Sequence, residues 1–233
     1  MTGAPRRRLV LFDLDGTLLT VSSERRFAWF LARHRVLGPR QALAYALFLL
    51  RWARHFGLDV GRRNKAYLAG LDRAVVGEWA QRFVETELRH RLYAPCFGRL
   101  QRHLASGDHV VLLTGTLAAI ADPLAQTLGI ARVVATISAF AGERYAAAPP
   151  EQHPLGISKR LLAERLCREY RVGFEDVVAY ADSWHDLPLL EAAGRPVAVR
   201  PDRALAAIAR AHDWEIIDDR AAPMFAANSR HSA

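Results

Sequence analysis

Two aspartates that follow a short apolar segment have the clearest capacity for chemistry in this chain. Residues 8–12 are predicted to form a buried strand, and Asp13, Leu14 and Asp15 come directly after it. Side chains two positions apart on an extended chain point the same way, so both carboxylates would project into one crevice. Because two close negative charges resist joint ionisation, one carboxylate can act as a nucleophile while the other keeps a proton for a leaving group.

The same residues have two other interpretations. An Asp-Gly pair, here Asp15 and Gly16, is typical of a turn. Asp13, Asp15, Thr17 and Glu24 also have the spacing of ligand positions one, three, five and twelve in a calcium-binding loop. Leu18, however, stands where that loop requires glycine, and a strand precedes the motif where the loop would follow a helix.

A second predicted strand, residues 109–113, leads into Thr114, Gly115 and Thr116. A hydroxyl and free backbone N–H groups just before a helix form a cradle for an anion. The alternative is that Thr114 or Thr116 only caps the predicted helix at residues 117–128.

Lys159 begins the predicted helix at residues 158–170, in a chain whose basic residues are almost all arginine. A cation at a helix N-terminus opposes the helix dipole, so its position there needs a reason. A compact ammonium suits a phosphoryl group that changes shape during reaction. The alternative is a solvated surface lysine.

A third predicted strand, residues 177–181, ends at Asp182, and Asp186 follows four residues later. Asp182 would project into the same crevice as Asp13. Several convergent carboxylates need a cation, and oxygen ligands favour magnesium. Asp186 could also form a capping box with Ser183, and the two roles are compatible.

The predicted elements alternate between strands and helices except in one block. Alternation favours a parallel sheet covered on both faces, with ligands at the carboxyl ends of its strands. Residues 21–92 interrupt it with helical patterns only, and are interpreted as a helical cap inserted after the first strand. Helices are expected at residues 24–36, 39–57, 62–71 and 75–92 of the cap and at 117–128, 158–170, 187–193 and 203–211 of the core. Strands are expected at residues 8–12, 109–113, 133–137, 177–181, 197–199 and 215–217, with a hairpin at 140–147.

These segments together resemble the four motifs of the haloacid dehalogenase superfamily, in the same order and at the same strand ends. The residues that carry the resemblance are Phe12-Asp13-Leu14-Asp15-Gly16-Thr17-Leu18, Thr114, Lys159 and Asp182-x-x-x-Asp186-Leu187-Pro188. The helical insert resembles the C1-type cap of the phosphoserine phosphatase-like branch. The resemblance implies an α/β fold, with a Rossmann-like doubly wound parallel sheet and an all-helical cap. We expect the core at residues 1–20 and 93–220, the cap at 21–92, and a disordered tail at 221–233.

The resemblance also implies roles for the motif residues. Asp13 would be the nucleophile of an aspartyl-phosphate mechanism and Asp15 the general acid and base. Thr114, Gly115 and Lys159 would hold the phosphoryl group. Mg²⁺ would bind Asp13, Asp182 and the backbone carbonyl of Asp15, with Asp186 binding or orienting through water.

The cap is expected to select the substrate. Glu24, Arg62 and Arg63 are candidates for holding a small zwitterionic leaving group, as in a phosphoserine-like metabolite. Residues 42–50 form an apolar run that could instead accept an acyl chain or lie on a membrane, which would indicate a lysophospholipid or other lipid phosphate. We favour a helix buried inside the cap for this run, and therefore a small phosphorylated substrate.

The composition also bears on partners, location and alternative functions. The net charge is +8, but the basic residues are scattered, so we expect no nucleic-acid partner. The longest apolar run is too short to span a bilayer, so no stable membrane insertion is expected. Two distant cysteines favour a reducing cytoplasm, and the oligomeric state is left open. A phosphoaspartate receiver domain and a catalytically silent phosphate-binding module remain as distant alternatives, because a receiver lacks both the insert and the Asp-x-Asp pair.

Overall fold

Six short apolar segments form one parallel sheet in the computed structural model, which describes residues 7–219. The predicted tail at residues 221–233 lies outside the described residues. The sheet order is β3-β2-β1-β6-β7-β8, and every neighbouring pair is parallel. The strands are β1 (Leu9–Phe12), β2 (His109–Leu117), β3 (Arg132–Thr136), β6 (Val177–Ala181), β7 (Arg195–Val199) and β8 (Glu215–Ile217). The predicted Rossmann-like parallel core is confirmed.

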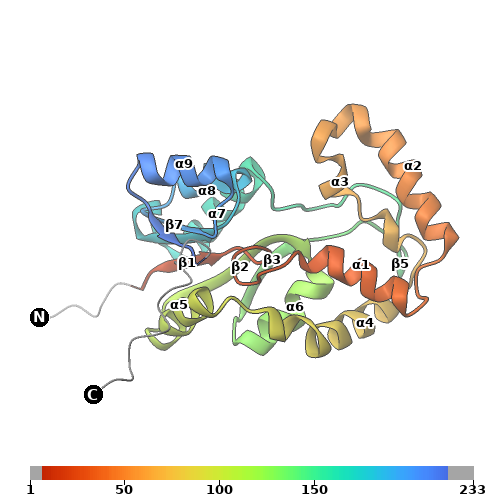
Figure 1. The fold of residues 1–233 in the computed structure, drawn as a ribbon, viewed down its shortest axis with the longest axis horizontal. Coiled ribbons are helices and arrows are strands. Elements are labelled where there is room, and N and C mark those ends of the chain that lie inside the picture. Colours follow the sequence, from red (N-terminus) through yellow and green to blue (C-terminus); the bar gives the residue numbers. More distant parts are fainter. Residues whose placement is uncertain (1–6, 220–233) are drawn as a thin grey trace, which may run out of the picture.

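Helices cover both faces of this sheet, as the alternation predicted (Figure 1). Leu9 and Leu11 of β1 pack in one core cluster with α7 (Ile157–Tyr170), α8 (Leu187–Leu190) and α9 (Arg203–Ala211). Val10 and Phe12 point to the other face and pack with α5 (Ala94–Ala105) and α6 (Ala118–Leu128). The sequence pattern did not predict α5, whose first turn contains Pro95 and whose middle contains Gly98. Both residues lower helix propensity, so packing of its apolar face must supply the stability.

The cap leaves the core after β1 and consists of helices, without a strand between Ser23 and Tyr93. Its elements are α1 (Ser23–Arg33), α2 (Pro39–Phe56), η1 (Gly57–Asp59), α3 (Val60–Arg63), η2 (Ala66–Leu68), α4 (Arg73–Thr86) and η3 (Leu88–Arg91). The single helix predicted for residues 62–71 was wrong. Asn64 adopts an extended conformation there, and its side chain accepts a hydrogen bond from the Ala66 N–H and donates to the Tyr45 carbonyl. Such a local side-chain bond competes with the helix and ends it.

The apolar helix α2 is not buried inside the cap, which corrects the interpretation favoured from the sequence. Phe48 is its one buried residue, whereas Leu43, Leu47 and Leu50 are exposed. The cap is too thin to cover α2 on two sides. The inner side of α2 packs against η2 and α3, and the outer side of α2 faces away from the molecule (Figure 1). Across residues 7–219, no helix is long and apolar enough to cross a membrane.

A small hairpin from the core segment joins the cap. Its strands β4 (Phe140–Ala141) and β5 (Arg144–Tyr145) are antiparallel, as predicted. The Gly70 N–H donates to the Tyr145 carbonyl at 2.9 Å, and the Tyr145 N–H donates to the Leu71 carbonyl at 3.0 Å. The division into a core at residues 1–20 and 93–220 and a cap at 21–92 stays a prediction, and this hairpin ties the two parts together.

Candidate active site

The end of β1 holds the first aspartate in place through the sheet itself. The Asp13 N–H donates to the Tyr180 carbonyl of β6 at 2.9 Å, which continues the β1–β6 ladder by one residue. Asp13 is buried at the carboxyl ends of the strands. Its carboxylate is therefore held at the end of the central strands of the sheet.

Lys159 lies between two of the predicted acidic residues. Its ammonium donates to Oδ1 of Asp13 and to Oδ2 of Asp186, both at 2.8 Å. The lysine is buried, so the solvated-surface alternative is wrong. Burial alone would lower the pKa of Lys159, but the charges of the two carboxylates outweigh it and raise this pKa above its ordinary value. The crevice thus contains a permanent cation.

Asp182 completes an acidic cluster with Asp13 and Asp186. One carboxylate oxygen of each can be chosen so that all three lie within 4.8 Å of one another. Burial first, and the neighbouring carboxylates second, raise the pKa of Asp182 to about 8. A cluster that resists ionisation in this way is suited to a divalent cation, which would stabilise the charged form of each ligand.

Gly16 shows how closely the first motif approaches this cluster. Its φ is +80°, and a Cβ at this position would lie 2.1 Å from Oδ2 of Asp182. The main chain after Asp13 therefore passes directly against the Asp182 carboxylate. Hard oxygen donors gathered against a bare backbone are the donor set that magnesium prefers, so these residues fit the ion.

Asp15 is held beside the cluster by the first residue of the cap. The Ser23 N–H donates to Oδ1 of Asp15 at 3.0 Å, and the Ser23 hydroxyl lies 3.3 Å from that of Thr116. Burial is the main cause that raises the pKa of Asp15 to about 7, while the Ser23 bonds oppose the shift. Asp15 can therefore hold a proton near neutral pH, as a general acid must.

The loop after the second predicted strand is part of β2 and lies at the crevice. Thr114 does not cap α6; its Oγ1 accepts a hydrogen bond from the Thr116 N–H at 3.2 Å. The backbone of Gly115 is held by the neighbouring strand β3, because the Thr136 hydroxyl donates to the Gly115 carbonyl at 2.6 Å. The same hydroxyl lies 2.8 Å from Nδ1 of His153. Since the hydroxyl has already given its one proton to Gly115, Nδ1 of His153 must carry the hydrogen of that bond.

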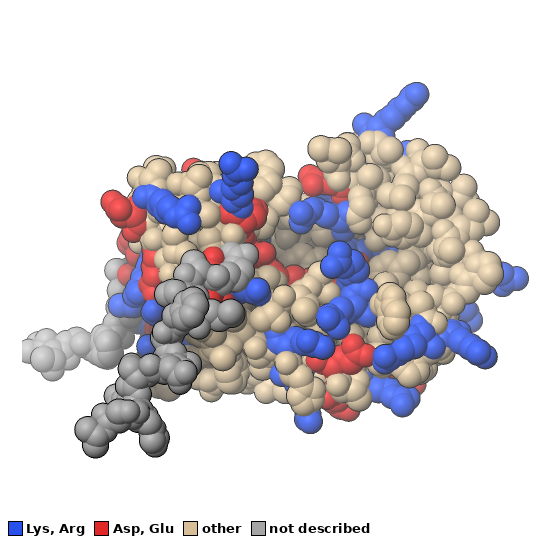
Figure 2. Space-filling view, viewed as in Figure 1, with Lys and Arg blue, Asp and Glu red and all other residues tan. Residues whose placement is uncertain are grey.

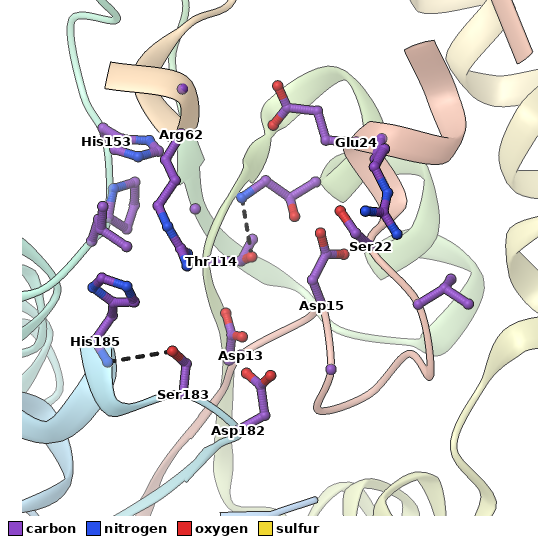
Figure 3. A pocket seen from close by; sticks show the side chains of 18 of the residues that line it. Asp13, Asp15, Ser22, Glu24, Arg62, Thr114, His153, Asp182, Ser183 and His185 are labelled. Carbon is purple, nitrogen blue, oxygen red and sulfur yellow. Dashed lines mark hydrogen bonds between the residues drawn. The ribbon is translucent and has the colours of Figure 1, made fainter. Parts of the chain in front are cut away.

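These residues line a cavity of about 1000 Å³ between core and cap. Figure 2 shows the hollow between the two lobes, with acidic and basic side chains along it. Figure 3 shows Asp13 and Asp182 at its floor and Glu24 and Arg62 of the cap above them. The motif residues predicted from the sequence all line this one cavity. They are Asp13, Asp15, Thr114, Gly115, Lys159, Asp182 and Asp186.

Only two of the three cap residues predicted to hold the substrate line the cavity. Glu24 and Arg62 line the cavity. Arg63 is not among the lining residues; its guanidinium lies over the ring of Phe56, 5.0 Å from the centroid. Glu24 is paired with Lys65, whose ammonium lies 2.5 Å from its Oε2 and also donates to the Arg62 carbonyl at 2.9 Å.

Lys65 and His153 line the cavity but were not among the site residues predicted from the sequence. Lys65 is the second lysine of an arginine-rich chain, the same signal that singled out Lys159, and it is buried. His153 is also buried, and burial together with the surrounding cations lowers its pKa to about 3, so it is neutral. No local motif marks His153, because its place depends on the loop between β5 and α7 folding back over Thr136.

Haloacid dehalogenase-like hydrolases match residues 10–191, a span that includes all the motif residues above. The chain belongs to this family. Several of its relatives are named as phosphatases, and the chain is an enzyme of the phosphatase class within this family. The family membership and the parallel core with a cap thus confirm the resemblance drawn from the sequence.

Several relatives of known sequence extend along nearly the whole chain. The chain is 32% identical to the "Inhibition of morphological differentiation protein" of Streptomyces azureus, over 91% of this chain and 78% of that protein. It is 27% identical to a phosphoserine phosphatase of Mycobacterium tuberculosis, over 91% and 70% of the two chains. It is 25% identical to a histidinol-phosphatase of Neisseria meningitidis, over 91% and 99%.

Solved structures share the fold. A protein of unknown function from Bordetella pertussis superposes with a TM-score of 0.77 at 30% identity, over 91% of this chain and 98% of that one. A substrate-bound phosphoserine phosphatase superposes with a TM-score of 0.65 at 16% identity, over 93% and 95% of the two chains. At that identity the likeness concerns the fold alone.

Proposed function

We propose that this phosphatase is a magnesium-dependent phosphomonoester hydrolase that forms an aspartyl-phosphate on Asp13. The observation that carries the proposal is the buried contact of Asp13 with Lys159 at 2.8 Å, inside a cluster that also contains Asp182 and Asp186. A carboxylate gathered with two others and one fixed cation, at the floor of a cavity, is suited to attack an anionic phosphorus centre. A receiver domain or a silent binding module would not need a second carboxyl group beside it whose pKa is raised to about 7.

The metal would be held by Asp13, Asp182 and the backbone carbonyl of Asp15, with Asp186 oriented nearby. When bound, Mg²⁺ would offset the negative charges of the carboxylates and of the phosphoryl oxygens, so that the Asp13 carboxylate could approach the phosphoryl group. The rest of the reaction is assigned to the chain's own groups. Lys159, the Thr114 hydroxyl and the Gly115 N–H would hold the phosphoryl oxygens in line with the attack.

The reaction then has two halves. In the first, an Asp13 oxygen forms a bond to phosphorus while the bond to the leaving oxygen breaks, and Asp15 gives that oxygen its proton. In the second, the ionised Asp15 takes a proton from a water molecule, which attacks phosphorus and releases phosphate from Asp13. Asp15 returns to its protonated form, so protons balance over the cycle.

The substrate we propose is a small phosphorylated metabolite with a polar, phosphoserine-like leaving group. The cap contributes polar and charged side chains to the cavity, among them Glu24, Arg62 and Lys65. The exposed leucines of α2 are not among the lining residues, so they cannot hold an acyl chain inside the cavity. Two relatives are named phosphoserine phosphatase and histidinol-phosphatase, which supports this choice over a lipid phosphate.

The test is a hydrolysis assay on a panel of phosphomonoesters, each with Mg²⁺ and with excess chelator. Phosphoserine, histidinol phosphate, an aryl phosphate and a lysophosphatidic acid cover the substrate classes. Activity that depends on Mg²⁺ and is highest on a small polar ester is expected. Full activity in chelator would remove the metal from the proposal, and a strong preference for lysophosphatidic acid would replace the substrate class.

A further inference from the structure

The outward side of α2 is an apolar face that no described part of the protein covers. Leu43, Leu47 and Leu50 are 60%, 55% and 78% exposed. Residues at this spacing lie on one side of a helix, so their side chains form a continuous row. Leu58, just beyond the helix, is fully exposed as well. We call Leu43, Leu47 and Leu50 the α2 leucine row.

The row is distinct from the part of α2 that serves the cap. Phe48 is buried on the opposite side of the helix, and Tyr45 lines the active-site cavity. The inner side of α2 therefore already has its packing partners. A second apolar side on the same helix contributes nothing to that packing, and single exposed leucines are common but an aligned row is not.

The charged residues on α2 are all basic. Between Glu24 and Asp59 the sequence has no acidic residue and seven arginines. Three of them, Arg40, Arg51 and Arg54, are exposed on α2 itself. None of these three lies within salt-bridge distance of a carboxylate in the described residues. The outward part of the lobe that carries α2 is a broad uncharged surface with basic side chains at its margins, and acidic side chains lie at its edge toward the hollow (Figure 2).

We propose that the α2 leucine row docks on the surface of an anionic lipid bilayer. A helix with leucines on one side and arginines beside them can lie in the interface, with the apolar row among the acyl chains and the guanidinium groups at the phosphates. The helix is too short in apolar sequence to span the bilayer, so the contact is peripheral and reversible. This binding goes beyond the proposed function and does not require hydrolysis of any substrate.

A second copy of the chain fits the row less well. In an antiparallel two-fold pairing centred on Leu47, Arg40 of one copy would meet Arg54 of the other, because each is seven residues from the centre. A parallel pairing would place each arginine against its own equivalent. Either arrangement puts like charges together across an apolar contact, which is unfavourable. Anionic lipid supplies the opposite charge and the apolar partner at once.

Vesicle sedimentation with the full-length protein tests the proposal without an activity readout. Phosphatidylcholine vesicles with and without phosphatidylglycerol are the probes. The protein should bind the mixed vesicles, bind pure phosphatidylcholine at least about tenfold more weakly, and be released by high salt. The triple change Leu43→Ser, Leu47→Ser and Leu50→Ser should weaken binding by more than about tenfold. Arg40→Gln, Arg51→Gln and Arg54→Gln should each weaken it by about fivefold.

Matched controls separate the row from exposed apolar residues in general. Leu161 of α7 and Val75 of α4 are also exposed, and Leu161→Ser and Val75→Ser should leave vesicle binding unchanged. Light scattering after size exclusion measures the oligomeric state of the wild type and the triple-leucine variant. No binding to the mixed vesicles, or binding that survives the triple-leucine change, would overturn the proposal. A wild-type dimer that the same change converts to a monomer would overturn it too, in favour of a second copy.

Discussion

The crevice at the ends of β1 and β6 and the outward face of α2 differ most in how far their neighbours constrain them. In the crevice, Lys159 bridges Asp13 and Asp186 at 2.8 Å each, and Gly16 leaves no room for a side chain beside Asp182. Over the 18 residues of α2, by contrast, only Phe48 is buried. The crevice positions are therefore expected to tolerate far fewer residue types than most positions of α2. Substitutions should separate the two regions by orders of magnitude.

The largest effect is expected at the nucleophile. Asp13→Asn keeps the size of the side chain but cannot attack phosphorus, so kcat with an aryl phosphate should fall by more than about 10⁴-fold. Circular dichroism and thermal unfolding should show the same fold. A folded variant with more than a tenth of wild-type activity would place the nucleophile elsewhere.

Asp15→Asn should have the next largest effect, because Asp15 serves both halves of the proposed reaction. The loss of a general acid and base costs about 10²–10⁴-fold. Rapid-quench kinetics should show slower formation and slower breakdown of the phosphoenzyme. If only formation slows, another group activates the water.

Gly16→Ala tests the close approach of backbone and carboxylate. The new Cβ would force the Asp182 carboxylate to turn away, so half-maximal activity should require at least about tenfold more Mg²⁺. Gly70→Ala is the matched control, since Gly70 has φ +78° but nothing within 4 Å of a Cβ. That variant should lose about 1–2 kcal/mol of unfolding free energy from backbone strain and keep the wild-type Mg²⁺ dependence. If both variants changed the Mg²⁺ dependence equally, backbone strain and not the contact with Asp182 would explain the effect.

The cap residues should affect selection more than chemistry. Glu24→Gln, Lys65→Met and Arg62→Gln should each raise KM for the preferred small substrate by about tenfold, as loss of a charged hydrogen bond does. Hydrolysis of an aryl phosphate should change by less than about threefold. Arg63→Gln is the control, because Arg63 lies over Phe56 and not along the cavity, and its KM should stay as in the wild type. Parallel losses on both substrates would assign these residues to folding.

The smallest effect is expected on the outward face of α2. Leu47→Ala should change the free energy of unfolding by no more than about 0.5 kcal/mol, since Leu47 is 55% exposed and has little packing to lose. The next residue on the helix is the control: Phe48→Ala should cost about 3–5 kcal/mol. A large loss at Leu47 in chemical denaturation would show that the face is covered in solution.

The same contrast explains what could be predicted from the sequence. Asp13, Asp15, Asp182 and Thr114 follow apolar strands, and the ends of parallel strands must meet at one edge of the sheet. Their convergence is therefore encoded by short-range patterns. Lys159 was identified by residue type, and the structure adds the two carboxylates that explain it.

The cap could be predicted only as a helical insert. Leucines on both sides of α2 are compatible with a buried helix, and the thickness of the cap, which decides exposure, depends on how α1, α3 and α4 pack. The Lys65–Glu24 pair joins residues 41 positions apart, so no local pattern encodes it. The break at Asn64 depends on a hydrogen bond to Tyr45, which exists only once α2 is in place.

Trapping the phosphoenzyme tests the central claim most directly. During turnover of an aryl phosphate with Mg²⁺, borohydride would reduce an aspartyl-phosphate to homoserine, and mass spectrometry of the digested protein would locate the change. Asp13→Asn provides the negative control. The account predicts homoserine at position 13 in the wild type with substrate, and none without substrate or in the variant. Homoserine at another aspartate, or none during rapid turnover, would contradict it.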